Sequence, residues 1–310
     1  MKFAIFGTGG VGGYFGGKLA QAGDDVTFIA RGEHLHAIRE HGLRVESING
    51  DFMVKPAQAT DDPASIGAVD YVLVCVKGWQ LPDAIEQMKP LVGAGTSVVW
   101  LGNGIEGTDM VVEAFGHERV IGGLCRISSF VGGAGVIRHV GVSPSIAFGE
   151  LDRAQSPRVE ALRAAFARFA DVRVEAPADI HVTMWEKFIF IAAVSGVGTV
   201  TRQTIGGYRS IPETRALLIA ALEETAALGR ARGVALDADV TKRILANIDA
   251  AATGVIPSMQ KDMTEGRPSE LETQTGYVTR LGRALGIATP AHDFIYAALL
   301  PQETKARGAN

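Results

Sequence analysis

The sequence predicts an α/β protein, in which a doubly wound sheet over residues 1–176 is followed by an all-α domain over residues 177–310. Short continuous apolar runs, of the kind buried on both faces of a parallel sheet, recur through the first half. Helical patterns alternate with these runs. After Pro177 the strand patterns end, and long helical patterns rich in Ala, Leu and Glu take over. A chain of 310 residues also exceeds the usual size of one hydrophobic core, so we expect two domains.

Each element of the first half is indicated by its apolar pattern. Continuous apolar or β-rich runs predict strands, and apolar residues at helical spacing predict helices. The predicted strands are residues 2–6, 25–30, 71–76, 96–101, 119–124 and 136–149. The predicted helices are residues 11–22, 81–91 and 158–169.

The second half is predicted to be helical. Residues 182–195 form an almost wholly apolar helical stretch. A capping box at residues 210–213, with Ser210 at the N-cap and Pro212 in the first turn, predicts a helix that ends near Gly233. Further helices are predicted at 237–252, at 270–285 and from Thr289 onward.

Composition narrows the class of protein. Hydrophobic residues make up 47% of the chain and charged residues 21%, as in ordinary soluble proteins. A net charge of -4 and a pI of about 6.0 provide no broad positive field, so we expect no nucleic-acid or membrane partner. No uninterrupted apolar run is long enough to span a bilayer. Cys75 and Cys125 are too few for a disulfide framework, which favours a cytoplasmic protein.

A glycine motif follows the first predicted strand. Gly7, Gly9 and Gly12 form G-x-G-x-x-G at the mouth of the first helix, inside a β-α-β unit. In this setting the glycines allow a sharp turn, close approach of a pyrophosphate and close packing of helix on strand. The motif therefore predicts a Rossmann-type dinucleotide site. The residues expected to bind the cofactor here are Gly7, Thr8, Gly9, Gly10, Val11 and Gly12.

The end of the second strand indicates which dinucleotide binds. An NAD site usually has Asp or Glu there to accept from the ribose 2′-hydroxyl, but Ala30 and Arg31 occupy this place. Arg31 therefore favours NADP, whose 2′-phosphate it would bind. The alternative is that Arg31 is a solvated loop residue and Glu33 is the ribose ligand.

Lys187 is the candidate proton donor in the helical half. It shares one helix face with Ile191 and Ser195, since the three are four residues apart. Desolvation would lower the pKa of this lysine toward working pH and make it a general acid. Two other interpretations stay open: the side chain covers apolar surface with its ammonium in water, or Glu186 pairs with it.

Two other polar segments attract attention. Asn103 lies just past a predicted strand, where ligands bind in open parallel sheets, although Asn-Gly is also a common turn pair. Residues 258–270 are polar, and without other information read as a solvated loop whose Ser269 caps the next helix. No metal site is expected, because His34 and His36 have no carboxylate or cysteine at ligand spacing beside them.

Together these pieces resemble the ketopantoate reductase (2-dehydropantoate 2-reductase) family, over nearly the whole chain. The resemblance rests on GTGGVG at 7–12, Arg31, CVKGWQ at 75–80, LGNGIEG at 101–107, WEKFIF at 185–190, SMQKD at 258–262, SELE at 269–272 and LGIATP at 285–290. It implies an NADP-dependent reductase that converts a 2-oxo acid, with 2-dehydropantoate the leading candidate, to a 2-hydroxy acid.

The resemblance also implies roles for individual residues. Lys187 would be the general acid, and Glu270 would lie near the cofactor and the reacting group. Ser258 would contact the substrate, Asn103 both ligands, and Lys77 the cofactor.

One departure concerns the substrate. The family carries asparagines four and eight residues after the lysine, facing the substrate, and here Ile191 and Ser195 stand there. A related 2-oxo acid with a more apolar side chain is therefore an alternative substrate, since isoleucine donates no hydrogen bond. A non-catalytic NADP-binding sensor and a reductase of imines or 3-hydroxy acids are further alternatives. The Ala- and Leu-rich helical half is compatible with a homodimer.

Overall fold

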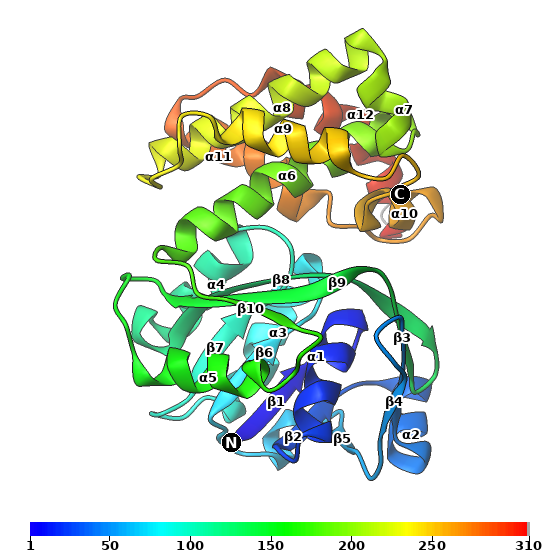
Figure 1. Cartoon of the computed structure of the whole chain (residues 1–310), viewed down its shortest axis with the longest axis vertical. Helices are drawn as coiled ribbons and strands as arrows, with labels where there is room; N and C mark the ends of the chain where they lie inside the picture. The colour runs from blue at the N-terminus through cyan, green and yellow to red at the C-terminus, as the bar shows by residue number, and fades with distance from the viewer. Residues whose placement is uncertain (309–310) are drawn as a thin grey trace. The chain divides into compact units, whose positions relative to one another are not determined.

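The computed structural model describes residues 1–308 and divides into two compact units (Figure 1). The first unit comprises residues 1–102 and 107–180. The second comprises residues 103–106 and the chain from His181 onward. The predicted boundary after residue 176 falls in the loop between β10 (Arg173–Glu175) and α6 (Ile180–Thr201). The predicted second domain ends in residues 309–310, which lie outside the described residues.

The first unit alternates strands and helices. Its strands are β1 (Lys2–Phe6), β2 (Asp25–Ile29), β3 (Leu43–Ser47), β4 (Phe52–Val54), β5 (Gln58–Thr60), β6 (Tyr71–Val74), β7 (Ser97–Trp100), β8 (Val120–Gly133), β9 (Val136–Glu150) and β10. Its helices are α1 (Gly10–Gln21), α2 (Gly32–His41), α3 (Leu81–Met88), α4 (Glu106–Phe115) and α5 (Pro157–Ala167). Every strand and helix predicted in this half is confirmed to within a few residues, except that β8 continues well beyond residue 124.

The ten described strands form one sheet in the order β4-β3-β9-β8-β7-β6-β1-β2-β5, with β10 beside β9. The run β8-β7-β6-β1-β2-β5 is parallel throughout. Numbered along the chain, it has the 3-2-1-4-5-6 strand order of a dinucleotide-binding sheet, which confirms the predicted fold class. Among the described strands, only β3–β4 and β8–β9 pair antiparallel.

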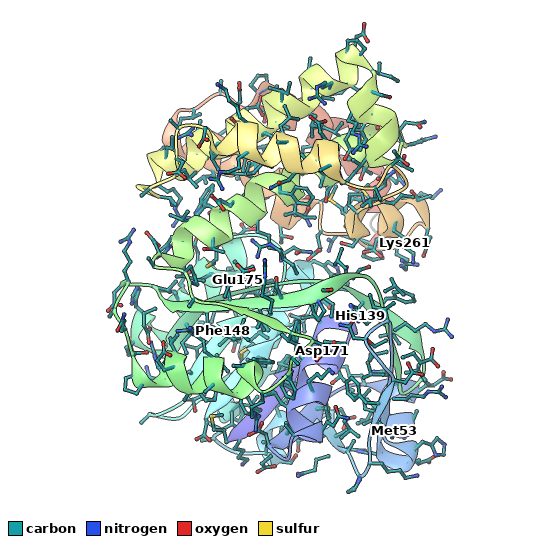
Figure 2. The ribbon with its side chains drawn as sticks, in the orientation of Figure 1. Met53, His139, Phe148, Asp171, Glu175 and Lys261 are labelled. Atoms are coloured by element: carbon teal, nitrogen blue, oxygen red, sulfur yellow. The ribbon has the colours of Figure 1, made fainter. Side chains whose placement is uncertain are left out.

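Helix α1 is held by close packing on the sheet and by a partly buried ion pair with the loop after α5. Gly16 lets the helix approach the sheet, because a Cβ there would lie 2.6 Å from Ile5. From the same helix, Tyr14 and Lys18 reach Asp171, labelled in Figure 2, over 3.1 and 2.8 Å. Burial alone would raise the pKa of Asp171, but the hydrogen bond and charge of Lys18 hold it below its ordinary value. The helix that follows the glycine motif is therefore held at several points.

The second unit is helical, as predicted. Its helices are α6, α7 (Ile205–Ser210), α8 (Pro212–Ala231), α9 (Val240–Ala250), α10 (Ser258–Thr264), α11 (Tyr277–Leu285) and α12 (Pro290–Ala306). A π-helical turn, Glu272–Gly276, leads directly into α11. The predicted helix 270–285 is thus confirmed, with a π-turn in its first half.

Two local predictions for this unit were wrong. Ser210 is not an N-cap: it is the last residue of α7, and its hydroxyl donates to the carbonyl of Gly207 over 2.9 Å. Ile211 caps α8 in its place, with Pro212 at the first helical position as expected. The segment after Pro257 is not a solvated loop either, because α10 buries Met259 and Met263 on one face.

Helix α6 packs against α11 through aromatic side chains. Trp185 packs edge-on against Phe188, and Phe188 against Tyr277 of α11. Within the described residues, α6 is the one helix long and apolar enough to cross a membrane by length and composition. However, 61% of that apolar window is buried, and the core helix of a globular protein passes the same test.

Candidate functional site

The glycine motif forms a turn that leaves no room for side chains on its inner side. Gly7 has φ +98°, and a Cβ there would lie 2.8 Å from Val76. At Gly12 a Cβ would lie 2.2 Å from the carbonyl oxygen of Gly7. At Gly9, in contrast, a Cβ would meet no atom within 4 Å. The turn is therefore closed toward the sheet and open at Gly9, which fits the approach of a pyrophosphate to the main chain.

The position of this turn in the sheet favours an anion. Gly7 follows β1 and Val76 follows β6, and the strand order reverses between these two neighbours. Ligands of doubly wound sheets bind at this point. No described side chain caps the N-terminus of α1, and its first turn holds no acidic residue. The helix dipole and the unpaired N–H groups there are left for a negatively charged group.

Thr8 and His34 hold the glycine turn in place. The Thr8 hydroxyl and N–H both donate to the carbonyl of Ile29, over 2.9 and 3.1 Å. The Gly135 N–H donates to Nδ1 of His34 over 3.0 Å, so Nε2 carries the proton and donates to the Thr8 carbonyl over 2.9 Å. Burial lowers the pKa of His34, although the Thr8 carbonyl opposes this. Sequence reasoning considered His34 only as a possible metal ligand. It missed the contact with Gly135, because the two residues are 101 positions apart in the chain.

The residues predicted to choose the dinucleotide lie just after β2. Arg31 is exposed, and its guanidinium donates to Gln87 of α3 over 2.5 Å. Glu33 is also exposed, in the first turn of α2. Lys77 follows β6, where its N–H donates to the side chain of Gln80 over 3.1 Å. Arg31 therefore lies at the carboxyl end of the parallel strands with its position restrained by one hydrogen bond.

In the second unit, the structure brings Asn103 and Glu270 together. The carboxamide of Asn103 donates to Oε2 of Glu270 over 3.0 Å. Glu270 is only 2% exposed, and the amide of Gln274 donates weakly to the same oxygen over 3.4 Å. Sequence reasoning proposed Asn103 and Glu270 separately and missed Gln274, which the π-turn places beside Glu270.

The segment 103–106 is held on this π-turn by two contacts. Gly104 has φ +96°, and a Cβ there would lie 2.8 Å from the carbonyl oxygen of Thr273. Arg280 of α11 donates to both carboxylate oxygens of Glu106 over 3.0 Å, and to Glu272 over 3.0 Å. The close backbone approach requires glycine at 104 and fixes Asn103 next to Glu270.

The remaining predicted residues lie on α6 and α10. Lys187 and Ile191 belong to a half-buried stripe of α6. Ser195 continues the same helix face but is 0% exposed, and its hydroxyl has no hydrogen-bond partner among the described residues. Ser258 is exposed at the start of α10. Lys187 and Ile191 are thus accessible on one face, while Ser195 is buried.

A metal site is not indicated in the part of the chain that the structure describes. No group of three or more His, Cys, Asp or Glu side chains is placed to hold a metal ion within residues 1–308. The candidate groups are the glycine turn in the first unit and, in the second, the half-buried Lys187 and the buried Glu270 with its amide partners.

Comparison with known protein families identifies the chain. The model of the ketopantoate reductase PanE/ApbA family matches residues 3–153, and the model of its C-terminal domain matches residues 179–303. The chain belongs to this family. Its similarity to the family therefore confirms the resemblance inferred from the motifs, and with it the class of oxidoreductases that act on a CH–OH group. Ketopantoate reductases use NADPH, and the open glycine turn and Arg31 fit such a dinucleotide.

Individual relatives cover almost the entire chain. A 2-dehydropantoate 2-reductase from Mesorhizobium japonicum is 32% identical over 96% of both chains. An uncharacterized oxidoreductase, YkpB of Bacillus subtilis, is 29% identical over 98% of this chain and 100% of its own.

Solved structures give the same picture. A PanE/ApbA family ketopantoate reductase from Ralstonia eutropha superposes with a TM-score of 0.89 at 31% identity, covering 99% of this chain and 100% of its own. A D-mandelate dehydrogenase, solved with NADH and anilino(oxo)acetate, shares the fold with a TM-score of 0.87 at 22% identity, over 99% of this chain and 100% of its own.

Proposed function

We propose that this ketopantoate reductase family member reduces a 2-oxo acid to a 2-hydroxy acid with NADPH, and that 2-dehydropantoate is the leading substrate. The observation that carries the proposal is the glycine turn at the switch point of the sheet, closed toward β6 and open at Gly9. A turn of this kind holds a dinucleotide pyrophosphate against an uncapped helix N-terminus. Family membership supports the type of reaction.

Each unit would contribute a different part of the chemistry. Residues 7–12 would bind the pyrophosphate and Arg31 the 2′-phosphate of the cofactor. Lys77, which follows β6, would also contact the cofactor. When bound, NADPH supplies the hydride that reduces the C2 carbonyl carbon. Lys187 would give a proton to the carbonyl oxygen as negative charge develops on it. An ammonium aimed at that oxygen stabilises the transition state more than the ketone.

Asn103 and Glu270 would orient the reacting groups. The carboxamide of Asn103 has a second N–H and a carbonyl oxygen beyond its bond to Glu270, so it has hydrogen-bonding capacity for a ligand. Glu270, held by two amide groups, presents a carboxylate in a fixed direction. We also propose that Ser258, exposed at the start of α10, contacts the substrate.

The identity of the side chain on the substrate depends on Ile191. This half-buried isoleucine shares the Lys187 stripe but offers no hydrogen bond, and leaving a substrate hydroxyl unpaired costs about 1–3 kcal/mol. A 2-oxo acid with a more apolar side chain is the second candidate on this observation. Ser195, buried one helical turn beyond Ile191 on α6, would also bind the substrate.

A substrate panel tests the proposal. NADPH absorbance is followed with 2-dehydropantoate and with 2-oxo acids whose side chains range from hydroxylated to branched apolar. Oxidation of NADPH with at least one member supports the reductase, and the order of kcat/KM values assigns the side chain. No oxidation with any member, alongside NADPH binding, would replace it with a cofactor-binding sensor. Activity only on imines or 3-hydroxy acids would replace the substrate class.

The setting of the enzyme is part of the proposal. Neither cysteine forms a disulfide bond within the described residues, Cys75 being half-buried and Cys125 buried, and we propose that the protein is cytoplasmic. We further propose a homodimer, which size-exclusion chromatography with light scattering would test.

A further inference from the structure

A buried carboxylate of α12 holds the residue that precedes Glu270. Glu303 is 1% exposed, and its carboxylate accepts hydrogen bonds from Ser269. The Ser269 hydroxyl donates over 2.6 Å, and the Ser269 N–H reaches the two carboxylate oxygens over 3.0 and 3.1 Å. Arg307, one turn later in the chain, donates to the same carboxylate over 2.7 Å. The buried charge is therefore fully hydrogen-bonded.

These contacts occupy every polar group of Ser269. Its carbonyl accepts from Arg307 over 3.1 Å, and its hydroxyl oxygen accepts from the Leu271 N–H over 3.1 Å. Ser269 itself is 0% exposed. The backbone on both sides of the Ser269 Cα is thus fixed, its N–H by a residue 34 positions later in the chain and its carbonyl by one 38 positions later.

We propose that Glu303 is a positioning residue for Glu270, an inference that rests on the proposed function of Glu270. The direction of a side chain depends on the conformation of its backbone. Here the hydrogen bonds of Glu303 fix the backbone at Ser269, one residue before Glu270. Asn103 and Gln274 then fix the carboxylate itself. A reacting group misplaced by 1 Å costs catalysis roughly a hundredfold, so such a distant anchor has a measurable effect on turnover.

Glu224 offers a matched control. Glu224 is another carboxylate that binds α12, with a side chain only 10% exposed, but it lies at the opposite end of that helix. It accepts from the N–H groups of Ala291 and His292 over 2.7 and 3.1 Å, and from the His292 ring over 2.8 Å. No hydrogen bond described for it reaches residues 269–276. Loss of Glu224 therefore reports the cost of losing a largely buried carboxylate whose hydrogen bonds do not involve Ser269.

The test is a double-mutant cycle with Glu303→Gln, Glu270→Gln and the double variant, with Glu224→Gln as control. We expect Glu303→Gln to lower kcat/KM for the 2-oxo acid about tenfold to a hundredfold. In the Glu270→Gln background the same change is expected to cost less than threefold, because the group it positions is gone. Equal losses in the two backgrounds, or an equal loss in Glu224→Gln at matched Tm, would overturn the proposal.

An activity-independent measurement separates this inference from the proposed function. Amide hydrogen exchange of residues 269–276 is expected to accelerate in Glu303→Gln and to stay unchanged in Glu224→Gln. An inactive wild type in the substrate panel defeats the proposed function, while unchanged exchange in this segment defeats the positioning role. Should Glu303→Gln fail to fold, Ser269→Ala removes the 2.6 Å bond to Glu303 and the Leu271 N–H bond to the same hydroxyl, while the Ser269 N–H bonds to Glu303 remain. It is read by the same two measurements, with the same expected direction.

Discussion

The carboxamide of Asn103 donates to the carboxylate of Glu270 over 3.0 Å, although 167 positions separate them in the chain. The contact exists because Gly104 approaches the carbonyl of Thr273 within the π-turn, and because Arg280 joins Glu106 to Glu272. Two motifs that look unrelated in the sequence, LGNGIEG and SELE, are therefore one polar cluster in the second unit.

Lys187→Ala is expected to reduce turnover strongly while NADPH binding stays nearly unchanged. A general acid contributes about 10²- to 10⁴-fold to the rate, and this lysine is assigned to the substrate oxygen rather than to the cofactor phosphates. Steady-state kcat and NADPH fluorescence titration check the two halves of the statement. Lys242→Ala, an exposed lysine of α9, serves as control and leaves kcat unchanged. Turnover of Lys187→Ala equal to that of the wild type would refute the proton-donor role.

Alanine substitutions at Gly12 and Gly9 are expected to affect different properties, stability at Gly12 and NADPH affinity at Gly9. A Cβ at Gly12 would lie 2.2 Å from a backbone oxygen, so Gly12→Ala lowers the free energy of unfolding by about 1–3 kcal/mol or more. A Cβ at Gly9 meets no atom of the protein, so Gly9→Ala keeps most of its stability but loses NADPH affinity, because the methyl group occupies the approach to the main chain.

Thermal unfolding and NADPH titration of both variants check this pair. Gly95→Ala is a suitable control, since a Cβ there also meets no atom and the residue lies outside the glycine turn. Wild-type NADPH affinity in Gly9→Ala would mean that the pyrophosphate lies elsewhere.

Arg31→Ala is expected to weaken NADPH binding and to leave NADH binding nearly unchanged. A hydrogen bond to a charged group is worth about 1.5–3 kcal/mol, which is roughly a tenfold to hundredfold change in Kd. Titration with both nucleotides measures the difference. If Glu33→Ala instead weakens NADH binding and Arg31→Ala changes neither Kd, Glu33 is the ribose ligand and the preference for NADP is wrong.

Stability is expected to depend on pH through His34. Burial holds the pKa of His34 in the folded protein below its ordinary value, about 6.5. Below that pH the unfolded chain binds more protons than the folded protein. The free energy of unfolding is therefore highest above about pH 6.5 and decreases as the pH falls. Protonation at Nδ1 also turns an N–H toward the N–H of Gly135.

Denaturant unfolding between pH 8 and pH 5 checks this dependence. We expect the wild type to lose more stability over this range than His34→Gln, whose amide does not titrate. His117→Gln, at an exposed histidine, is expected to keep the wild-type slope. A wild-type slope retained in His34→Gln would assign the pH dependence to another group.

The sequence predicted the strands and helices of the first unit and the glycine turn well because their signals are local. Continuous apolar runs and glycines at fixed spacing identify the β-α-β unit without any knowledge of distant contacts. The capping box at Ser210 misled for the same reason: the pattern is local, but α7 extends to Ser210 and its hydroxyl binds back to Gly207. Helix α10 was missed because its polar residues hide two buried methionines.

The groups that the sequence did not reveal act across long separations. His34 binds Gly135, and Glu303 binds Ser269, through contacts that no spacing rule describes. A buried carboxylate near the end of the chain looks like an ordinary charged residue of a surface helix until its partners are known. The helix pattern suggested Lys187 and the family resemblance supplied Glu270, but the residues that hold Glu270 in place required the fold.

The π-turn at Glu272–Gly276 separates the direction of the Glu270 side chain from the orientation of the buried face of α11, which a regular helix would couple. Successive residues of an α-helix are rotated by about 100° around the axis. Shortening this wider turn by one residue would therefore rotate Glu270, which precedes the turn, by about that angle around the helix axis. The buried face of α11 would keep its orientation. Insertion or deletion at this single turn thus gives the scaffold a way to re-aim its carboxylate toward ligands of different shape without repacking the helix behind it.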